Sequence, residues 1–194
     1  ADAGALPGLS VPVGTDAQGR SVTVDLVRDG PHALVAGTTG AGKSELLRTL
    51  VAGLALTCPP SRLGVLLLDY KGGSSLGQLA RLPHAVGLVT DLDPYLARRV
   101  LVSLQAELRR RERVLAEAGQ REVVGADGPV PRLLVVVDEF RVLAEEMPDF
   151  LGGLVRVATV GRSLGVHLVL ATQRPAGAVT PDLRANVNLR VALR

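Results

Sequence analysis

Short aliphatic runs that end in Gly, Asp or Thr alternate along the chain with longer amphipathic stretches. Such runs are typical of β-strands, and near-continuous Val and Leu runs are typical of parallel strands that are covered on both faces. The pattern therefore predicts an α/β fold in which helices cover both faces of a mostly parallel sheet. The predicted strands are 22–26, 33–36, 63–68, 85–89, 133–137, 166–171 and 189–193.

Two amphipathic stretches predict helices, over 45–56 and 93–118. In the second, apolar side chains recur on one face and arginines on the other, with Asp91 or Asp93 as the expected N-cap and Pro94 in the first turn. The apolar face carries Leu96, Val100, Leu104, Leu108 and Leu115, and the basic face carries Arg98, Arg99, Arg109, Arg110 and Arg113. Segments 14–21 and 119–132, which are rich in Gly, Asp and Pro, predict a turn and a loop.

Length and composition are those of one globular domain. The 194 residues carry a formal net charge of +3, which does not by itself indicate nucleic acid. The four aromatic residues are scattered, which disfavours a platform for stacking single-stranded bases. Cys58 is the only cysteine, so no disulfide within the chain is possible, and the longest aliphatic runs are too short to span a membrane.

One segment between a predicted strand and a predicted helix matches the phosphate-loop pattern in full. Glycines let successive N–H groups face phosphate oxygens, the lysine reaches the β and γ oxygens, and the serine hydroxyl ligates Mg²⁺. A glycine-rich turn that caps a helix by chance is the alternative, and the flanking strand and helix disfavour it. The segment predicts an ATP site formed by Gly37, Thr38, Thr39, Gly40, Ala41, Gly42, Lys43, Ser44 and Glu45, with Ser44 as a magnesium ligand.

Two further strands end in polar residues. The run 133–137 delivers Asp138 and Glu139, the first suited to Mg²⁺ and its water shell and the second to orienting the attacking water. Such a pair after a strand is a weak signal alone, and the phosphate loop strengthens it. The run 166–171 leads to Gln173, which predicts a γ-phosphate sensor if this strand is inserted between the other two; a polar turn before Pro175 is the alternative.

Six stretches along the chain carry a resemblance that reaches beyond these motifs. They read GPH (30–32), LLDYKGG (67–73), LPH (82–84), PDF (148–150), GRSLGVHL (161–168) and ATQRP (171–175). From about Gly30 to Arg194 the chain resembles the FtsK/SpoIIIE family, and especially the EccC-type ATPase domains of type VII secretion systems. The segment 119–132 is short for that family, and the chain stops before its C-terminal segment.

The resemblance implies a RecA-like, additional-strand P-loop ATPase domain over 30–194, after a lead-in over 1–29. It implies ATP and Mg²⁺ as cofactors, assembly into a ring, expected to be a hexamer, and a membrane-anchored parent on the cytoplasmic side that moves secreted proteins. A double-stranded DNA translocase and a low-turnover assembly module are the alternatives. In such rings a neighbour supplies an arginine. Family spacing points to Arg99, with Arg98 and Arg162 as further candidates, and a solvated basic helix face is the alternative.

Two other patterns predict no site. Residues 161–165 match the spelling of a hydrolase nucleophile elbow, but that motif needs a strand before it and a helix after it, whereas here a predicted strand follows. His32, His84 and His167 are far apart in the sequence, and the chain has no cysteine pair with which to build a zinc site. We therefore expect the histidines to cap strands or loops.

Overall fold

The computed structural model describes residues 8–70, 76–90, 94–125, 128–173 and 180–194. Every predicted strand is present, with its ends within one residue of the prediction. The elements are β1 (Ser10–Thr15), β2 (Ser21–Asp25), β3 (His32–Gly37), α1 (Lys43–Thr57), β4 (Leu63–Asp69), the 3₁₀ helix η1 (Gly77–Arg81), β5 (Ala85–Thr90), α2 (Pro94–Glu117), β6 (Arg132–Asp138), α3 (Phe140–Glu146), α4 (Pro148–Val160), β7 (Val166–Thr172), α5 (Pro181–Asn186) and β8 (Leu189–Leu193).

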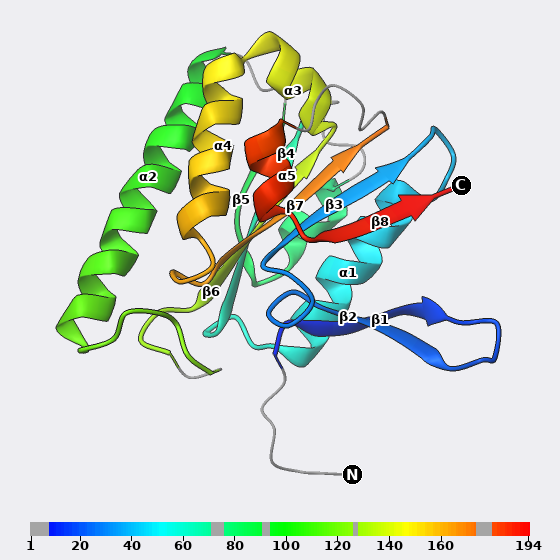
Figure 1. The fold of residues 1–194 in the computed structure, drawn as a ribbon, viewed down its shortest axis with the longest axis horizontal. Helices are drawn as coiled ribbons and strands as arrows, with labels where there is room; N and C mark the ends of the chain where they lie inside the picture. Colours follow the sequence, from blue (N-terminus) through cyan, green and yellow to red (C-terminus); the bar gives the residue numbers. More distant parts are fainter. Residues whose placement is uncertain (1–7, 71–75, 91–93, 126–127, 174–179) are drawn as a thin grey trace.

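A parallel sheet forms the centre of the molecule (Figure 1). In the part of the chain that the structure describes it has six strands in the order β5-β4-β6-β7-β3-β8, and all neighbours are parallel. The strand β7 therefore lies between β3, which leads into the glycine-rich segment, and β6, which ends in Asp138. This order confirms the predicted additional-strand arrangement, and it brings the carboxyl ends of the strands to one edge.

Helices cover both faces of this sheet. α2, α3, α4 and α5 lie on one face, and α1 lies on the other together with the hairpin of β1 and β2 (Figure 1). In β6, Leu133, Val135 and Val137 pack on the α2 and α4 side, whereas Leu134 and Val136 pack on the α1 side. All five are buried, which explains why this strand reads as a continuous aliphatic run.

The antiparallel hairpin of β1 and β2 packs against α1. Leu9, Val11 and Leu26 are at most 1% exposed and belong to the same apolar cluster as α1. The contact is close at Gly53, where an added Cβ would lie 2.1 Å from Cγ2 of Val11. The hairpin thus shares a core with the rest of the described chain, and the boundary after residue 29 stays a prediction.

The sequence pattern misses some short elements. The turn predicted over 14–21 is shorter, because β1 continues to Thr15 through a register shift between Pro12 and Gly14 that breaks its alternation. The two predicted helices are present as α1 and α2, whereas α3, α4 and α5 are not predicted. α3 and α5 are too short to show a helical period, and α4 contains two adjacent glycines. Asp91 and Asp93 lie outside the described residues.

The long helix α2 buries its predicted apolar stripe and exposes its predicted basic face. One arginine departs from that division: Arg111 is 2% exposed on the buried face. It donates from Nε to Glu107 Oε1 at 2.8 Å and from Nη1 to the carbonyl of Leu164 at 2.9 Å. These bonds satisfy the buried guanidinium and tie α2 to the turn that precedes β7. No helix among the described residues is long and apolar enough to cross a membrane.

His32 links β3 to two neighbouring elements. Leu168 N donates to its Nδ1 at 3.0 Å, so its Nε2 carries the proton and donates to the carbonyl of Ala158 at 2.8 Å. The ring is therefore neutral, with both nitrogens bonded. Burial lowers the pKa of His32 to about 4.

His167 makes a similar link with the opposite tautomer. Its Nδ1 lies 3.1 Å from the carbonyl of Pro31 and donates to it, and its Nε2 accepts from Arg132 Nη1 at 3.2 Å. Burial, and then the charge of Arg132, lower the pKa of His167 to about 3. Two neutral imidazoles thus connect β3, β6, β7 and α4, as structural groups bonded to backbone atoms and to the Arg132 side chain.

We expect these histidines to make the fold sensitive to acid. Unfolded histidines have a pKa near 6.5, so below that pH the unfolded chain binds more protons than the folded one. The stabilisation is complete above pH ~6.5 and is lost as the pH falls towards about 4, with a loss of about 2 kcal/mol per histidine by pH ~5. Urea unfolding at about pH 7.5 and about pH 5 measures it. His32→Gln should lose less stability between these conditions, and an equal loss would contradict the assignment.

Candidate functional site

The glycine-rich turn joins β3 to α1. β3 ends at Gly37 and α1 begins at Lys43, so residues 38–42 make the turn. Gly40 and Gly42 have φ angles of 83° and 87°, a left-handed backbone that favours glycine. The first N–H groups of α1 have no partner within the helix and face this turn, which makes it a favourable place for an anion.

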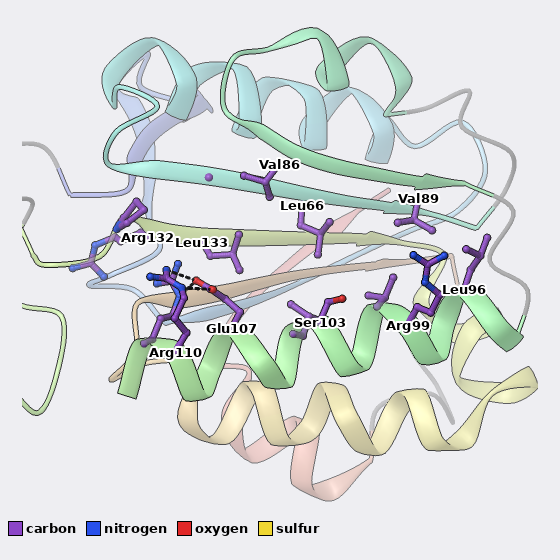
Figure 2. Close-up of a pocket in the computed structure, with 15 residues that line it drawn as sticks. Leu66, Val86, Val89, Leu96, Arg99, Ser103, Glu107, Arg110, Arg132 and Leu133 are labelled. Atoms are coloured by element: carbon purple, nitrogen blue, oxygen red, sulfur yellow. Dashed lines mark hydrogen bonds and ion pairs between the residues drawn. The ribbon is translucent and has the colours of Figure 1, made fainter. Parts of the chain in front are cut away.

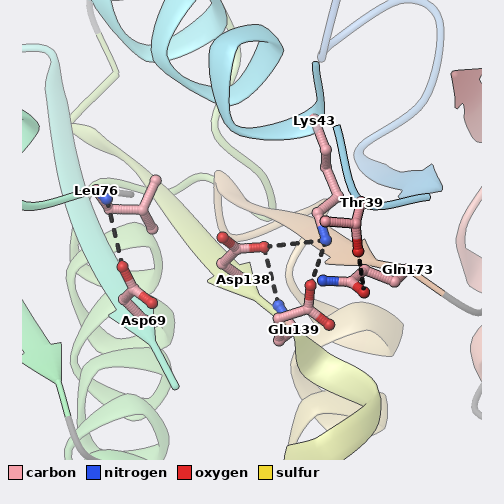
Figure 3. Close-up of polar contacts among 7 residues, drawn as sticks. All are labelled: Thr39, Lys43, Asp69, Leu76, Asp138, Glu139 and Gln173. Carbon is pink, nitrogen blue, oxygen red and sulfur yellow. Dashed lines mark hydrogen bonds and ion pairs between the residues drawn. The ribbon is translucent and has the colours of Figure 1, made fainter. Parts of the chain in front are cut away.

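A buried ion-pair cluster connects α1 to the end of β6 (Figure 3). Lys43 Nζ donates to Glu139 Oε1 at 2.5 Å and lies 3.6 Å from Asp138 Oδ1. All three side chains are only 7% exposed. Charged groups that are this buried are stable only when they compensate one another. The lysine therefore allows two adjacent carboxylates to share the site.

Glu139 has an unusual backbone. Its φ of 55° is the one positive value of a non-glycine residue in the described chain. It caps the amino terminus of α3, and its N–H donates to Asp138 Oδ1 at 3.0 Å. A left-handed residue that is not glycine costs of order 1–2 kcal/mol. The turn directs the Glu139 carboxylate towards Lys43 (Figure 3).

Gln173 comes directly after β7 and faces the turn from across the pocket. Thr39 Oγ1 donates to Gln173 Oε1 at 3.0 Å. The amide nitrogen of Gln173 points towards Glu139 (Figure 3). Because β7 lies between β3 and β6, Gln173 is placed between the glycine-rich turn and the carboxylates.

These residues line one pocket of about 380 Å³ at the carboxyl edge of the sheet. The Ser44 hydroxyl and the Asp138 carboxylate supply the hard oxygen ligands that Mg²⁺ takes together with phosphates and water, so they fit a magnesium nucleotide. The described lining residues are Thr38, Thr39, Gly40, Gly42, Lys43, Ser44, Glu45, Asp138, Glu139 and Gln173. The predicted phosphate-loop, carboxylate and glutamine residues are thus brought together, except that Gly37 and Ala41 do not line the pocket, and their individual roles stay predictions.

The three candidate arginines lie away from this pocket. Arg98 and Arg99 are exposed near the start of α2, and the Arg99 guanidinium lies 5.7 Å from the ring centroid of Tyr95. Arg162 is exposed in the turn before β7, at the amino edge of the sheet and opposite the pocket. No arginine lines the pocket among the residues that the structure describes.

A larger groove, of about 590 Å³, lies between α2 and the side of the sheet formed by β5, β4 and β6 (Figure 2). Its middle is apolar, Arg99 lies at one end, and Glu107 lies at the other with Arg110 and Arg111. Side-chain hydrogen bonds from Arg110, and to a smaller extent the charge of Arg111, hold the pKa of Glu107 below its usual range. This groove shares none of its described lining residues with the nucleotide pocket. The larger cavity is therefore not the one that holds the predicted nucleotide residues.

Sequence reasoning gives Asp69 no separate role, although it lies beside the site. It ends β4, pairs in register with Asp138 and is 1% exposed. Its Oδ2 accepts from Leu76 N at 3.3 Å (Figure 3). Its position depends on the strand order, which no local pattern contains. The matching stretches 71–73 and 174–175 lie outside the described residues.

The fold and the pocket define a P-loop ATPase of the additional-strand kind, because β7 with Gln173 lies between the strand of the phosphate loop and the strand of the Asp-Glu pair. Over residues 5–151 the chain matches the FtsK/SpoIIIE family, and it belongs to this family. The resemblance found in the sequence is thereby confirmed.

Named relatives point to one branch of the family. The type VII secretion system protein EssC of Staphylococcus aureus is 40% identical over 197 residues, which are 96% of this chain and 13% of EssC. The ESX secretion system protein EccC of Geobacillus thermodenitrificans is 38% identical over 201 residues, 96% of this chain and 14% of that protein. The cytoplasmic domain of the Thermomonospora curvata type VII secretion ATPase EccC superposes with a TM-score of 0.88 at 38% identity, covering 96% of this chain and 24% of that one.

Removing Lys43 should destabilise the nucleotide-free chain. Lys43→Met leaves two buried carboxylates without the lysine charge, and breaking such a pair costs about 3–5 kcal/mol. Adding Glu139→Gln should restore part of the loss, because one negative charge is removed with it. The control is Arg20→Met at the exposed Arg20–Asp16 pair, which should cost far less because water screens this pair. Urea unfolding measures all three, and a Lys43→Met loss no larger than the control would contradict the cluster's importance.

Proposed function

We propose that this chain binds ATP with Mg²⁺ and hydrolyses it as the motor domain of a ring-forming secretion ATPase. The observation that carries the proposal is the convergence of three adjacent strands on one pocket: β3 contributes the phosphate loop, β6 the carboxylate pair and β7 the polar side chain of Gln173. The family membership and the names of the relatives support the same class of protein.

The residues divide the work of hydrolysis between them. The loop N–H groups and Lys43 bind the β and γ phosphates, and Ser44 and Asp138 would hold Mg²⁺, which neutralises phosphate charge when bound. Glu139 orients a water molecule and accepts its proton as the water oxygen bonds to the γ-phosphorus and the bond to the leaving ADP oxygen breaks. Gln173 donates to the γ-phosphate. In this scheme Lys43 exchanges its contact with Glu139 for one with the phosphates. The Glu139 carboxylate can then accept a hydrogen bond from the water.

The cargo that we propose is secreted protein, moved by a membrane-anchored parent at the cytoplasmic face of the membrane. The relatives at 38–40% identity carry type VII or ESX secretion names. A solved Thermomonospora curvata EccC containing ATPases 2 and 3, with TM-score 0.86 and 28% identity, is in complex with a signal sequence peptide; the match covers 100% of this chain and 38% of that one. These names favour protein over the DNA cargo that the FtsK/SpoIIIE motor could also move.

Ring assembly would complete the site with an arginine from a neighbouring subunit. The described lining of the pocket contains no arginine, whereas Arg98 and Arg99 are exposed near the end of α2 that follows the carboxyl end of β5. They therefore lie towards the edge of the sheet that carries the pocket, whereas Arg162 lies at the other edge. We propose Arg99 as the residue that reaches the neighbour's nucleotide.

The proposed reaction predicts that binding and turnover can be separated. Glu139→Gln should bind ATP but hydrolyse it at least ~100-fold more slowly, because an amide accepts no proton. Lys43→Ala should weaken Mg·ATP binding severely in calorimetry. Phosphate release in the assembled parent protein measures turnover. Unchanged Mg·ATP affinity in Lys43→Ala would contradict the assignment of the pocket as a nucleotide site. Wild-type turnover in Glu139→Gln would show that another residue activates the water.

An arginine supplied by a neighbour predicts that the isolated chain is a slow ATPase. Such an arginine contributes on the order of 10³ to 10⁵ in rate, or ~4–7 kcal/mol of barrier. Fusion to a hexameric scaffold should therefore raise turnover. Within one assembly, mixing Glu139→Gln subunits with Arg99→Ala subunits should restore some activity, since some interfaces then combine an intact Glu139 with an intact Arg99. Full activity of Arg99→Ala alone, or no recovery in confirmed mixed rings, would reject Arg99.

A further inference from the structure

One side-chain hydrogen bond crosses from the phosphate loop to the end of β7. It joins Thr39 Oγ1 to Gln173 Oε1 at 3.0 Å. Thr39 is exposed and Gln173 is only partly buried, so neither belongs to the apolar core. Thr38, the preceding residue, takes part through its backbone, where its carbonyl accepts from Ala41 N at 3.1 Å. The Thr39 hydroxyl is therefore directed at a side chain proposed to contact the nucleotide.

From this contact we propose that Thr39 is a positioning residue that sets which end of the Gln173 amide faces the nucleotide. The inference rests on the proposed nucleotide function and adds a role for the Thr39 hydroxyl beyond that of its backbone. An amide has a carbonyl oxygen that only accepts and an NH₂ group that only donates. By donating to Oε1, Thr39 turns the NH₂ group of Gln173 towards the pocket and Glu139 (Figure 3).

The chemistry of the ligand makes this orientation matter. The oxygens of a γ-phosphate are acceptors with negative charge, so they are stabilised by an N–H donor and repelled by a carbonyl oxygen. The flipped amide would present its oxygen to the phosphate. Because ADP has no γ-phosphate, an amide held in this orientation favours ATP over ADP. The Thr39 hydroxyl is thus a determinant of the discrimination between the two nucleotides.

A threonine suits position 39 because its hydroxyl orders the Gln173 side chain before the nucleotide binds. A free glutamine side chain samples many rotamers, and fixing it when the ligand arrives lowers affinity. Threonine is branched at Cβ and has few rotamers itself, so it is a rigid donor. A serine would keep the hydroxyl with more freedom, and a valine would keep the shape without the hydrogen bond.

The test compares Mg·ADP with the magnesium complex of β,γ-imido-ATP, a non-hydrolysable analogue, by calorimetry on the 194-residue chain. Thr39→Val should bind the analogue about three- to tenfold more weakly, the effect of one lost hydrogen bond, and should weaken ADP binding by a smaller factor, because ADP has no γ-phosphate. Thr39→Ser should restore most of the analogue affinity. Thr159→Val removes an exposed hydroxyl that bonds within α4 and should change neither affinity.

A double-mutant cycle with Gln173→Ala decides whether Thr39 acts through Gln173. If it does, Thr39→Val and Gln173→Ala should lower the affinity for the analogue by similar factors, and the double variant should bind it no more weakly than either single variant. Additive losses, an equal effect on ADP, or no rescue by serine would overturn the proposal. If the wild-type chain binds neither nucleotide, the proposed function fails instead, and the two failures are distinguishable.

Discussion

The nucleotide site depends on the mutual compensation of three buried charges. Lys43 belongs to the helix on one face of the sheet, whereas Asp138 and Glu139 lie at the end of a central strand, and the opposite charges offset the cost of burying all three. Their contact fixes the distance between the phosphate loop and the carboxylates. Because β7 lies between β3 and β6, Gln173 at its end lines the same pocket.

Much of this arrangement can be predicted from the sequence, because it is local. The spacing of residues 37–44 specifies a turn and a helix start, and uninterrupted aliphatic runs specify buried parallel strands with polar residues at their ends. Prediction fails where local signals are short or conflicting. α3 and α5 are too brief for a period, Gly152 and Gly153 mask α4, and Arg111 occupies a core position because Glu107 and the Leu164 carbonyl satisfy it.

The contacts between strands are the part that sequence reasoning cannot supply. Thr39 and Gln173 are 134 positions apart, and they meet because β7 pairs with β3. Asp69 lies beside Asp138 for the same kind of reason, since β4 pairs with β6. The order of parallel strands is set by how whole layers of helices and strands pack. The position of β7 between β3 and β6 is indicated by the resemblance to a family and not by any local pattern. Residue types along the sequence thus indicate the kind of site, and the strand order determines which side chains meet there.

The left-handed backbone of Glu139 has a consequence for the evolution and engineering of this domain. A glycine at that position would relieve the backbone strain but would remove the carboxylate nearest to Lys43, and losing one partner of a buried ion pair costs about 3–5 kcal/mol, which is more than the strain. The ion pair with Lys43 therefore offsets the cost of the left-handed backbone, and a carboxylate is kept at a turn that would otherwise favour glycine. Screens that rank variants by melting temperature would therefore tend to keep the carboxylate at this position.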